Sequence, residues 1–440
     1  MRLLHVICST DPESGGPVEA LLRISEVLLC DGHEIEVVSL ESEDEAAKRA
    51  FPFPVRGVGR GVGRYRYNSL LAPWLHRQAE DFDAVILHGL WNYSSFGAWR
   101  GLRKLRTPYY IFAHGMMDPW FRKKYPVKHL LKQVFWTIGE GRVLQDAQKV
   151  LFTCEEEKVR ARGVFYGHAY EEGVVLLGTS DPGGDISAQK AAFSRAFPEL
   201  NGKRLLLYLS RVHPKKGCDL LIQAFAAEAA RMHPDFELAI AGPDPLGWIP
   251  ELQTLAGQLG VAKRIHWLGM LRGELKWGAF RSAEALILPS HQENFGFAVV
   301  EAMACSTPVL ISNKVNIWRE VEASRAGLVE PDTTDGTRSL IRRFCALSRE
   351  ECLLMADSAR RGYLQHFDIE VTAHEFARAI GFSRGESANN KFAIQGQLRP
   401  VEPSMSGGIE NLSEAVDIHG AEGIHDEQEG KYCRDYLDLQ

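Results

Sequence analysis

The stretch 285-ALILPSHQENFGFAVVEAMA-304 joins a short apolar run to a longer apolar segment through a polar loop. The first four residues match a buried strand of a parallel sheet, and the sequence from Phe297 onward has the pattern of a helix packed on a sheet. Glu293 therefore lies in the connecting loop and Glu301 on the helix. In α/β proteins this strand-to-helix junction is where ligands bind.

The two glutamates leave several kinds of site open. Their spacing alone allows general acid/base chemistry or metal binding as well as hydroxyl binding. Gly296 lets a ligand approach the backbone closely, and the first amides of the helix can bind an anion. A loop carboxylate beside such amides suits a hydroxyl-rich, negatively charged ligand such as a nucleotide sugar.

Strand and helix patterns alternate along the chain in two successive series, separated by the turn-rich residues 178–184. This organisation predicts an α/β fold with two Rossmann-like parallel-sheet domains facing one cleft. We expect a first domain over residues 1–178, a second over 179–365, a helix over 366–384 that crosses back to the first domain, and a disordered acidic tail over 385–440.

The composition is that of an ordinary globular protein, with 45% apolar and 25% charged residues in 440. The net charge of −6 comes from the tail, where residues 385–440 hold eleven acidic and four basic residues. Eight scattered cysteines without metal-ligand spacing favour a reduced compartment without a structural metal. The first residues read as a strand and no stretch is long enough to span a membrane, so we expect a cytoplasmic protein.

Two cations follow the strand expected over 205–209. Arg211 and Lys216 stand in one strand-to-helix loop, SRVHPKKG, and could form a clamp for a diphosphate. At an effective dielectric constant near 20, each cation contributes on the order of 4 kcal/mol to a nearby phosphate, so two could stabilise a departing diphosphate without a metal. Alone, the motif is more often a solvated loop; together with Glu293 and Glu301 it favours the clamp.

The first domain offers weaker signals. Gly15 and Gly16 lie between the first strand and its helix, where adjacent glycines allow close approach to a ligand but more often form a plain turn. His114 closes another strand and could bind a sugar from the sheet edge, and His88 ends the preceding strand in the same way. The acids of 81-DFD-83 precede a strand, which favours a turn over a metal site.

Two cationic, aromatic stretches lie at residues 56–77 and 121–136. Such segments can dock on anionic lipid headgroups, while an ordinary solvated helix and loop explain them equally well. A nucleic-acid partner is disfavoured, because the body of the chain is nearly neutral and contains no recognised binding module.

With these residues in place, the chain resembles the retaining nucleotide-sugar glycosyltransferases of the GT-B fold, in particular the E-x7-E group called glycosyltransferase family four. The resemblance covers about residues 1–381 and rests on ENFG through Glu301, on Ser210 and Arg211 with Lys216 and Gly217, and on 241-AGP-243. The usual Pro-Asn-Gly turn between the domains is replaced by 177-LGTSD-181, which leaves the hinge unassigned.

The resemblance implies a role for each motif residue. Glu293 would contact sugar hydroxyls and Glu301 the ribose, while Arg211 and Lys216 would hold the diphosphate. The implied donor-binding set is Gly15, Gly16, Arg211, Lys216, Glu293, Asn294, Phe295, Gly296 and Glu301, and the implied catalytic set is His114, Arg211, Lys216 and Glu293. No metal or other cofactor is implied, since the nucleotide-diphosphate sugar is itself the donor substrate.

The sequence thus predicts a retaining, metal-independent hexosyltransferase that acts on a glycan or lipid-linked saccharide in surface polysaccharide biosynthesis. A nucleotide-sugar 2-epimerase of the same architecture is one alternative, and a non-catalytic sugar-nucleotide-binding protein is another. The missing dinucleotide fingerprint disfavours an oxidoreductase. Peripheral contact with the inner face of the cytoplasmic membrane is left open.

Overall fold

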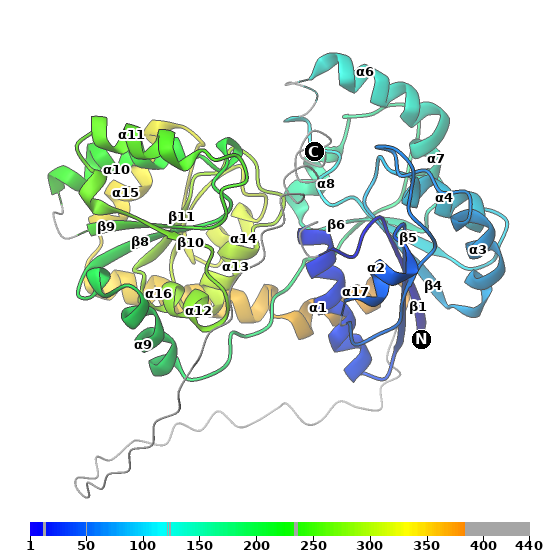
Figure 1. Cartoon of the computed structure of the whole chain (residues 1–440), viewed down its shortest axis with the longest axis horizontal. Coiled ribbons are helices and arrows are strands. Elements are labelled where there is room, and N and C mark those ends of the chain that lie inside the picture. Colours follow the sequence, from blue (N-terminus) through cyan, green and yellow to red (C-terminus); the bar gives the residue numbers. More distant parts are fainter. Residues whose placement is uncertain (12–14, 50, 121, 123–124, 233–235, 383–440) are drawn as a thin grey trace, which may run out of the picture. The chain divides into compact units, whose positions relative to one another are not determined.

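The computed structural model describes residues 1–11, 15–49, 51–120, 122, 125–232 and 236–382 (Figure 1). Met1–Gly381 form one unit that contains two separate β-sheets. The expected acidic tail over 385–440 lies outside the described residues, as do Lys123 and Lys124 of the second cationic stretch.

The first sheet has seven parallel strands in the order β3-β2-β1-β4-β5-β6-β7. Its central strands are almost wholly buried, as expected for a parallel sheet covered on both faces. The strands are β1 (Arg2–Ile7), β2 (Glu34–Ser39), β3 (Val55–Gly57), β4 (Ala84–His88), β5 (Tyr109–Phe112), β6 (Lys149–Phe152) and β7 (Glu172–Val174).

The second sheet has six parallel strands in the order β10-β9-β8-β11-β12-β13. They are β8 (Arg204–Leu209), β9 (Phe236–Ala241), β10 (Ile265–Gly269), β11 (Ala285–Leu288), β12 (Val309–Ser312) and β13 (Gly327–Glu330). In each sheet the strand order reverses beside the first strand, between β1 and β4 and between β8 and β11. Such a reversal separates the loops at the carboxyl ends of the two strands and leaves a place for a ligand.

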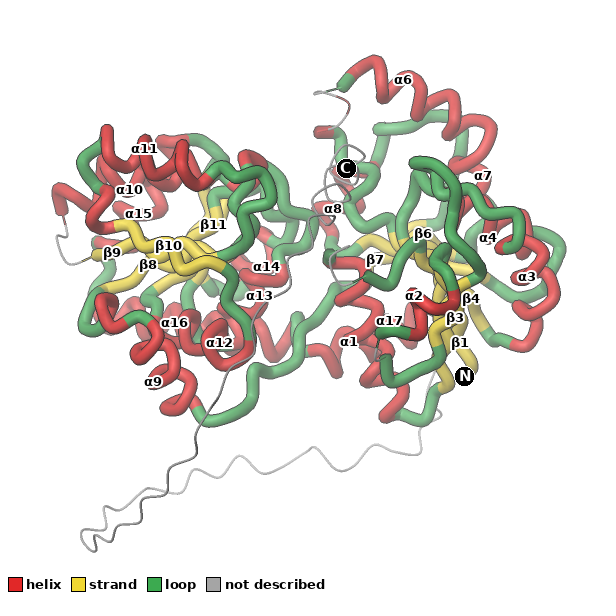
Figure 2. The backbone as a smooth tube through the Cα atoms, in the orientation of Figure 1, coloured by secondary structure: helices red, strands yellow, loops and turns green. Residues whose placement is uncertain are grey.

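Helices cover both faces of each sheet (Figure 2). Those before β8 are α1 (Gly16–Cys30), α2 (Glu43–Ala47), α3 (Leu71–Gln78), α4 (Tyr93–Leu102), α6 (Pro126–Phe135), α7 (Gly141–Gln145), α8 (Glu155–Ala161) and α9 (Ile186–Ala196). The later ones are α10 (Cys218–Met232), α11 (Ile249–Gln258), α12 (Gly273–Ser282), α13 (Phe297–Ala304), α14 (Trp318–Ala323), α15 (Thr334–Cys345), α16 (Arg349–His366) and α17 (Ile369–Ala379).

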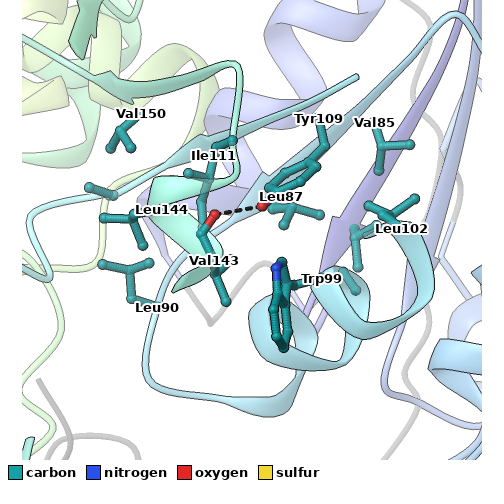
Figure 3. Packing of buried hydrophobic residues seen from close by; sticks show 14 of the residues in the cluster. Val85, Leu87, Leu90, Trp99, Leu102, Tyr109, Ile111, Val143, Leu144 and Val150 are labelled. Atoms are coloured by element: carbon teal, nitrogen blue, oxygen red, sulfur yellow. Dashed lines mark hydrogen bonds between the residues drawn. The ribbon is translucent and has the colours of Figure 1, made fainter. Parts of the chain in front are cut away.

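The core of the first sheet shows how these layers hold together (Figure 3). Side chains of β4, β5 and β6 pack against Trp99 of α4 and against Val143 of α7. The hydroxyl of Tyr109 donates a 2.6 Å hydrogen bond to the carbonyl of Val143, so the one polar atom of this buried ring is satisfied. Each large apolar side chain buried here contributes about 2 kcal/mol.

The last described helix, α17, packs on α1 of the first sheet. His374 bonds to Asp31 at 2.8 Å, and the hydroxyl of Tyr110 in β5 donates to the carbonyl of Ile380 at 3.0 Å. The two parallel-sheet halves and a C-terminal helix that returns to the first half confirm the fold class that the sequence predicts.

Candidate functional site

The loops at the reversal of the second sheet carry the motif residues. The loop after β8 holds Arg211 and Lys216, and the loop after β11 holds Glu293 and Gly296. A backbone hydrogen bond of 2.8 Å from His291 to the carbonyl of Lys215 ties the two loops together. The parallel pairing of β8 with β11 thus brings together two segments that are far apart in the sequence.

Lys216 connects the two loops through its side chain. It is buried, and its Nζ donates to the carboxylate of Glu293 and, at 3.4 Å, to the carbonyl of Gln292. Gly217 makes this packing possible: its φ is +69°, and a Cβ atom there would lie 2.3 Å from the carbonyl oxygen of Pro289. Lys216 and Glu293 therefore form one charge-paired group.

Arg211 differs from Lys216 in being exposed. Its backbone is fixed, because its carbonyl accepts a 2.9 Å hydrogen bond from the buried hydroxyl of Tyr208. Its guanidinium has no hydrogen-bond or ion-pair partner among the described residues. A cation on a fixed backbone with no protein partner is available to an anionic ligand.

The loop after β11 presents backbone donors. Glu293 is held in a local bridge, donating through its amide to the carbonyl of Lys314 and accepting at its carbonyl from the amide of Asn316, both at 3.0 Å. Gly296 takes the left-handed φ of +89° just before α13. No described residue accepts a hydrogen bond from the backbone amides of residues 295–298. These amides and the helix dipole favour an anion at this position.

Glu301 lies one turn into α13 and is buried among cations. Its Oε1 accepts from Lys276 Nζ at 2.9 Å and lies 3.5 Å from a guanidinium nitrogen of Arg23 in α1. Neither cation is apparent as a partner in the sequence, because Lys276 stands in a separate helix and Arg23 is 278 positions away. The carboxylate is therefore held in place by two cations.

Two loops of the first sheet meet this segment. A Cβ atom at Gly16 would lie 3.5 Å from the ring of Phe297, and one at Gly115 would lie 2.7 Å from the side chain of Asn294. Asn294 also bonds to the first half of the molecule, because its Nδ2 donates a hydrogen bond to Thr153 Oγ1 at 3.2 Å. Of the predicted residues, Gly16 thus lies beside Phe297 of the other half, and Asn294 lies beside Gly115. Phe295 contributes backbone here, because its side chain is buried against Phe297 and Phe367.

His114 follows β5 and takes an unusual backbone conformation, with a φ of +49°. Its Nε2 hydrogen-bonds to Nδ1 of His88 at 3.1 Å, and burial lowers the pKa of the partly buried His114 to about 3. The imidazole is therefore neutral. The next residue, Gly115, donates its amide to the buried carboxylate of Glu157, which fixes the loop beside Asn294.

Comparisons with known proteins agree with this arrangement. The family model described as "Glycosyl transferase 4-like domain" matches residues 15–175, and "Glycosyl transferases group 1" matches residues 189–358. The chain belongs to the GT-B glycosyltransferases. It is 32% identical over 180 residues to D-inositol 3-phosphate glycosyltransferase of Mycolicibacterium gilvum, covering 39% of this chain and 38% of that one. It is 28% identical over 292 residues to D-inositol 3-phosphate glycosyltransferase of Geodermatophilus obscurus, and the alignment covers 63% of this chain and 62% of that one.

The glycosyltransferase fold is also found in solved structures. Anabaena Alr3699/HepE in complex with UDP-glucose aligns with a TM-score of 0.66 at 18% identity, covering 86% of this chain and 99% of that one. At this identity the likeness shows the fold alone. The chain spans less than two thirds of the length of the two curated relatives above.

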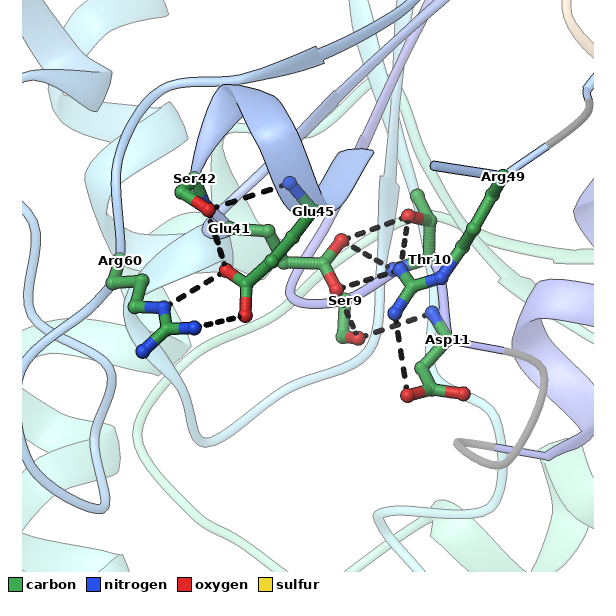
Figure 4. A network of polar contacts seen from close by, with 8 residues as sticks. All are labelled: Ser9, Thr10, Asp11, Glu41, Ser42, Glu45, Arg49 and Arg60. Atoms are coloured by element: carbon green, nitrogen blue, oxygen red, sulfur yellow. Dashed lines mark hydrogen bonds and ion pairs between the residues drawn. The ribbon is translucent and has the colours of Figure 1, made fainter. Parts of the chain in front are cut away.

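Sequence reasoning missed the set of residues that holds the chain just after β1 (Figure 4). Glu41 accepts from Ser9 Oγ and from the amide and hydroxyl of Thr10, each at 2.8 Å, and pairs with Arg49 at 2.7 Å. Burial acts to raise the pKa of Glu41, but these hydrogen bonds outweigh it and the pKa is lowered. The network fixes residues 9–11, just after β1. Gly15, at the start of α1, has a φ of +88°, which favours glycine.

Among the described residues there is no group of three or more His, Cys, Asp or Glu side chains placed to hold a metal ion. Of the acids at 81–83, Asp83 accepts a 2.8 Å hydrogen bond from the amide of Arg2 at the start of β1. Metal independence stays a prediction.

Proposed function

We propose that this protein is a retaining hexosyltransferase that moves a hexose from a nucleotide-diphosphate sugar to a glycan or lipid-linked saccharide in surface polysaccharide biosynthesis. The observation that carries the proposal is the site at the reversal of the second sheet. There the Lys216–Glu293 pair, the unpartnered Arg211 guanidinium and the amides that begin α13 meet on fixed backbone. Cations and amides in this arrangement match a diphosphate.

The chemistry follows from where negative charge grows. When the bond between the sugar and the diphosphate breaks, charge accumulates on the leaving phosphate, and Arg211 and Lys216 would stabilise it more in the transition state than in the ground state. Retention at the anomeric carbon fits attack from the face that the leaving group vacates. We infer that neither glutamate moves a proton and that no metal or other cofactor is needed.

The glutamates would then bind the two ends of the donor. Glu293 lies beside Lys216 and would accept from hydroxyls of the hexose, while Glu301 would accept from the ribose hydroxyls. The ion pair of Glu301 with Lys276 keeps that carboxylate oriented before the donor arrives. A structure of HepE with UDP-glucose supports a donor of this class in the same fold.

The activity is tested by incubating the full chain, with a chelator present, with a panel of nucleotide-diphosphate hexoses and a lipid-linked saccharide extract. We expect nucleoside diphosphate release that depends on acceptor, and a product whose anomeric proton coupling shows the donor's configuration. An epimer formed without acceptor would instead establish the epimerase alternative. Donor binding with no transfer to any acceptor would establish the non-catalytic alternative, and an inverted product would overturn retention.

We further propose that α6 brings the protein to an anionic membrane surface. None of its residues is buried, and Val127, Leu130, Leu131 and Val134 are 74%, 65%, 67% and 56% exposed. Their spacing places all four on one face of the helix. An apolar face of this kind is unfavourable in water and favours an apolar medium.

Charge identifies which surface would cover this face. The sequence contains no Asp or Glu between Asp118 and Glu140, whereas Arg122, Lys128 and Lys132 lie along it. Basic side chains beside an apolar stripe suit a helix lying in an anionic lipid interface. No helix among the described residues is long and apolar enough to cross a membrane.

The membrane proposal is tested by co-sedimentation with vesicles of phosphatidylglycerol and phosphatidylcholine. Leu130→Glu with Leu131→Glu should abolish binding at unchanged nucleotide affinity. Leu353→Glu with Leu354→Glu is the matched control, because these leucines are equally exposed on α16, 63% and 60%. Equal vesicle binding by both variants would contradict the proposal. A wild-type dimer that Leu130→Glu with Leu131→Glu dissociates would also contradict it, because a second copy of the chain would then cover this face.

A further inference from the structure

Three histidines form a continuous hydrogen-bonded row across three adjacent strands of the first sheet. His5 Nδ1 lies 2.9 Å from His88 Nε2, and His88 Nδ1 lies 3.1 Å from His114 Nε2. The rings of His5 and His88 are inclined by 23°, and those of His88 and His114 by 16°. Each ring therefore presents a nitrogen edge to the next, nearly in one plane. The row begins inside β1 and ends at the loop beside Asn294.

All three imidazoles are neutral in this environment. Burial lowers the pKa of His5 and of His114 to about 3, and burial with the neighbouring histidines lowers that of His88 well below its usual value. A neutral imidazole has one N–H donor and one bare acceptor nitrogen. The row must therefore run in one direction, with every N–H pointing either toward His5 or toward His114.

The buried end decides between the two directions. His5 Nε2 is inaccessible to solvent and has no hydrogen-bond partner among the residues that the structure describes. If every N–H pointed toward His5, Nε2 of His5 would carry a buried N–H with no acceptor. If every N–H points toward His114, Nε2 of His5 is only an acceptor without a donor. Unpartnered buried N–H groups are rarer than unpartnered acceptors. The favoured row has His5 donating to His88 and His88 donating to His114.

We propose that His5 and His88 are positioning residues that hold His114 in the tautomer with its proton on Nδ1, so that His114 donates a hydrogen bond to a hydroxyl oxygen of the bound sugar. This inference rests on the proposed function, in which Glu293 binds the hexose: the loop of His114 and Gly115 lies against Asn294, the residue next to Glu293. Nδ1 is the nitrogen left for a ligand, since no described residue hydrogen-bonds to it. His114 then orients the donor sugar and does not act as a base.

The tautomer is tested without any substrate. The full chain is labelled with nitrogen-15 at its histidines, and the His114 signals are assigned from a His114→Gln sample. We expect a protonated nitrogen at Nδ1 and a bare nitrogen at Nε2. His88→Phe removes the donor to Nε2 and should change this pattern. The reverse tautomer in the wild type, or an unchanged pattern in His88→Phe, would overturn the inference.

Kinetics test what the tautomer does. His88→Phe should lower kcat by about 10- to 100-fold, the effect that loss of an orienting partner has for metal-bound histidines, with nucleoside diphosphate affinity unchanged. His88→Asn can keep a donor near the position of Nδ1 and should restore most of the turnover. Equal loss in both variants, with both folded, would overturn the positioning role. A wild-type chain with no transfer activity would contradict the proposed function, while the spectrum would still decide the tautomer.

Discussion

The reversals of the two sheets share one topology but differ in charge. At β8 and β11 of the second sheet, Lys216 pairs with Glu293 and Arg211 stays exposed. At β1 and β4 of the first sheet, the side chains that join the two strands are the neutral histidines His5 and His88, while the charged Glu41 and Arg49 pair with each other beside the loop after β1. Charges suit a phosphate, whereas neutral donors suit a hydroxyl-bearing sugar. The difference suggests that a donor molecule lies with its anionic part on one sheet and its transferred part toward the other.

The largest effect is expected when a charged side chain is removed at the reversal of the second sheet. Lys216→Ala leaves Glu293 without its cation and removes a charge that would stabilise the leaving diphosphate, so kcat should fall by about 10²- to 10³-fold. Steady-state kinetics measure this, with Lys190→Ala as a control because Lys190 is exposed on α9. If Lys216→Ala keeps the turnover of the control, the charge of Lys216 at the reversal of the second sheet has no catalytic role.

A smaller effect is expected where the two halves touch. Gly115→Ala meets two obstacles, a φ of +75° and the side chain of Asn294 at 2.7 Å. Gly163 has a similar φ of +70° with nothing within 4 Å, so Gly163→Ala reports the backbone cost alone. Urea unfolding should show each variant losing about 1 kcal/mol from the backbone, and Gly115→Ala about 1–2 kcal/mol more. Equal losses would show that Asn294 is not packed against this loop.

The smallest effect is expected in the pH dependence of stability that His5 causes at the reversal of the first sheet. The pKa of His5 is about 3 in the folded protein and near 6.5 in the unfolded chain, so folding excludes a proton. The stability that depends on neutral His5 is complete above pH 6.5 and falls as the pH drops toward 3. Between pH 7.5 and 5.0, the free energy of unfolding of the wild type should fall by about 2 kcal/mol more than that of His5→Asn. If the free energies of unfolding of the two proteins change in parallel with pH, folding does not lower the pKa of His5.

Much of the second half could be predicted from sequence, because its signals are local. The apolar run of β11, the turn at Gly296 and the helix from Phe297 stand next to each other in the chain, and the structure has β11 at Ala285–Leu288 and α13 at Phe297–Ala304. Arg211 and Lys216 could be assigned to one loop for the same reason. Their position beside Glu293 follows from the pairing of β8 with β11, which a strand-to-helix alternation makes the expected arrangement.

The supporting contacts could not be predicted, because they join distant segments. The pairing of Glu301 with Lys276 and Arg23 depends on how α1, α12 and α13 pack, which no local pattern encodes. His5 reads as an ordinary strand residue, and only the register of β1 with β4 brings it to His88. Glu41 resembles a surface acid until the loop after β1 is seen to fold over it. Such residues are fixed by tertiary packing rather than by sequence periodicity.

We propose above all that the reversal of the second sheet binds the nucleotide-diphosphate part of a sugar donor. Calorimetric titration with a panel of nucleoside diphosphates, in the presence of a chelator, tests it most directly. We predict that at least one binds the wild type, that Glu301→Ala weakens its binding by about tenfold or more through loss of the ribose contact, and that Lys190→Ala leaves it unchanged. No binding by any nucleoside diphosphate, or equal affinity in Glu301→Ala and wild type, would contradict the account.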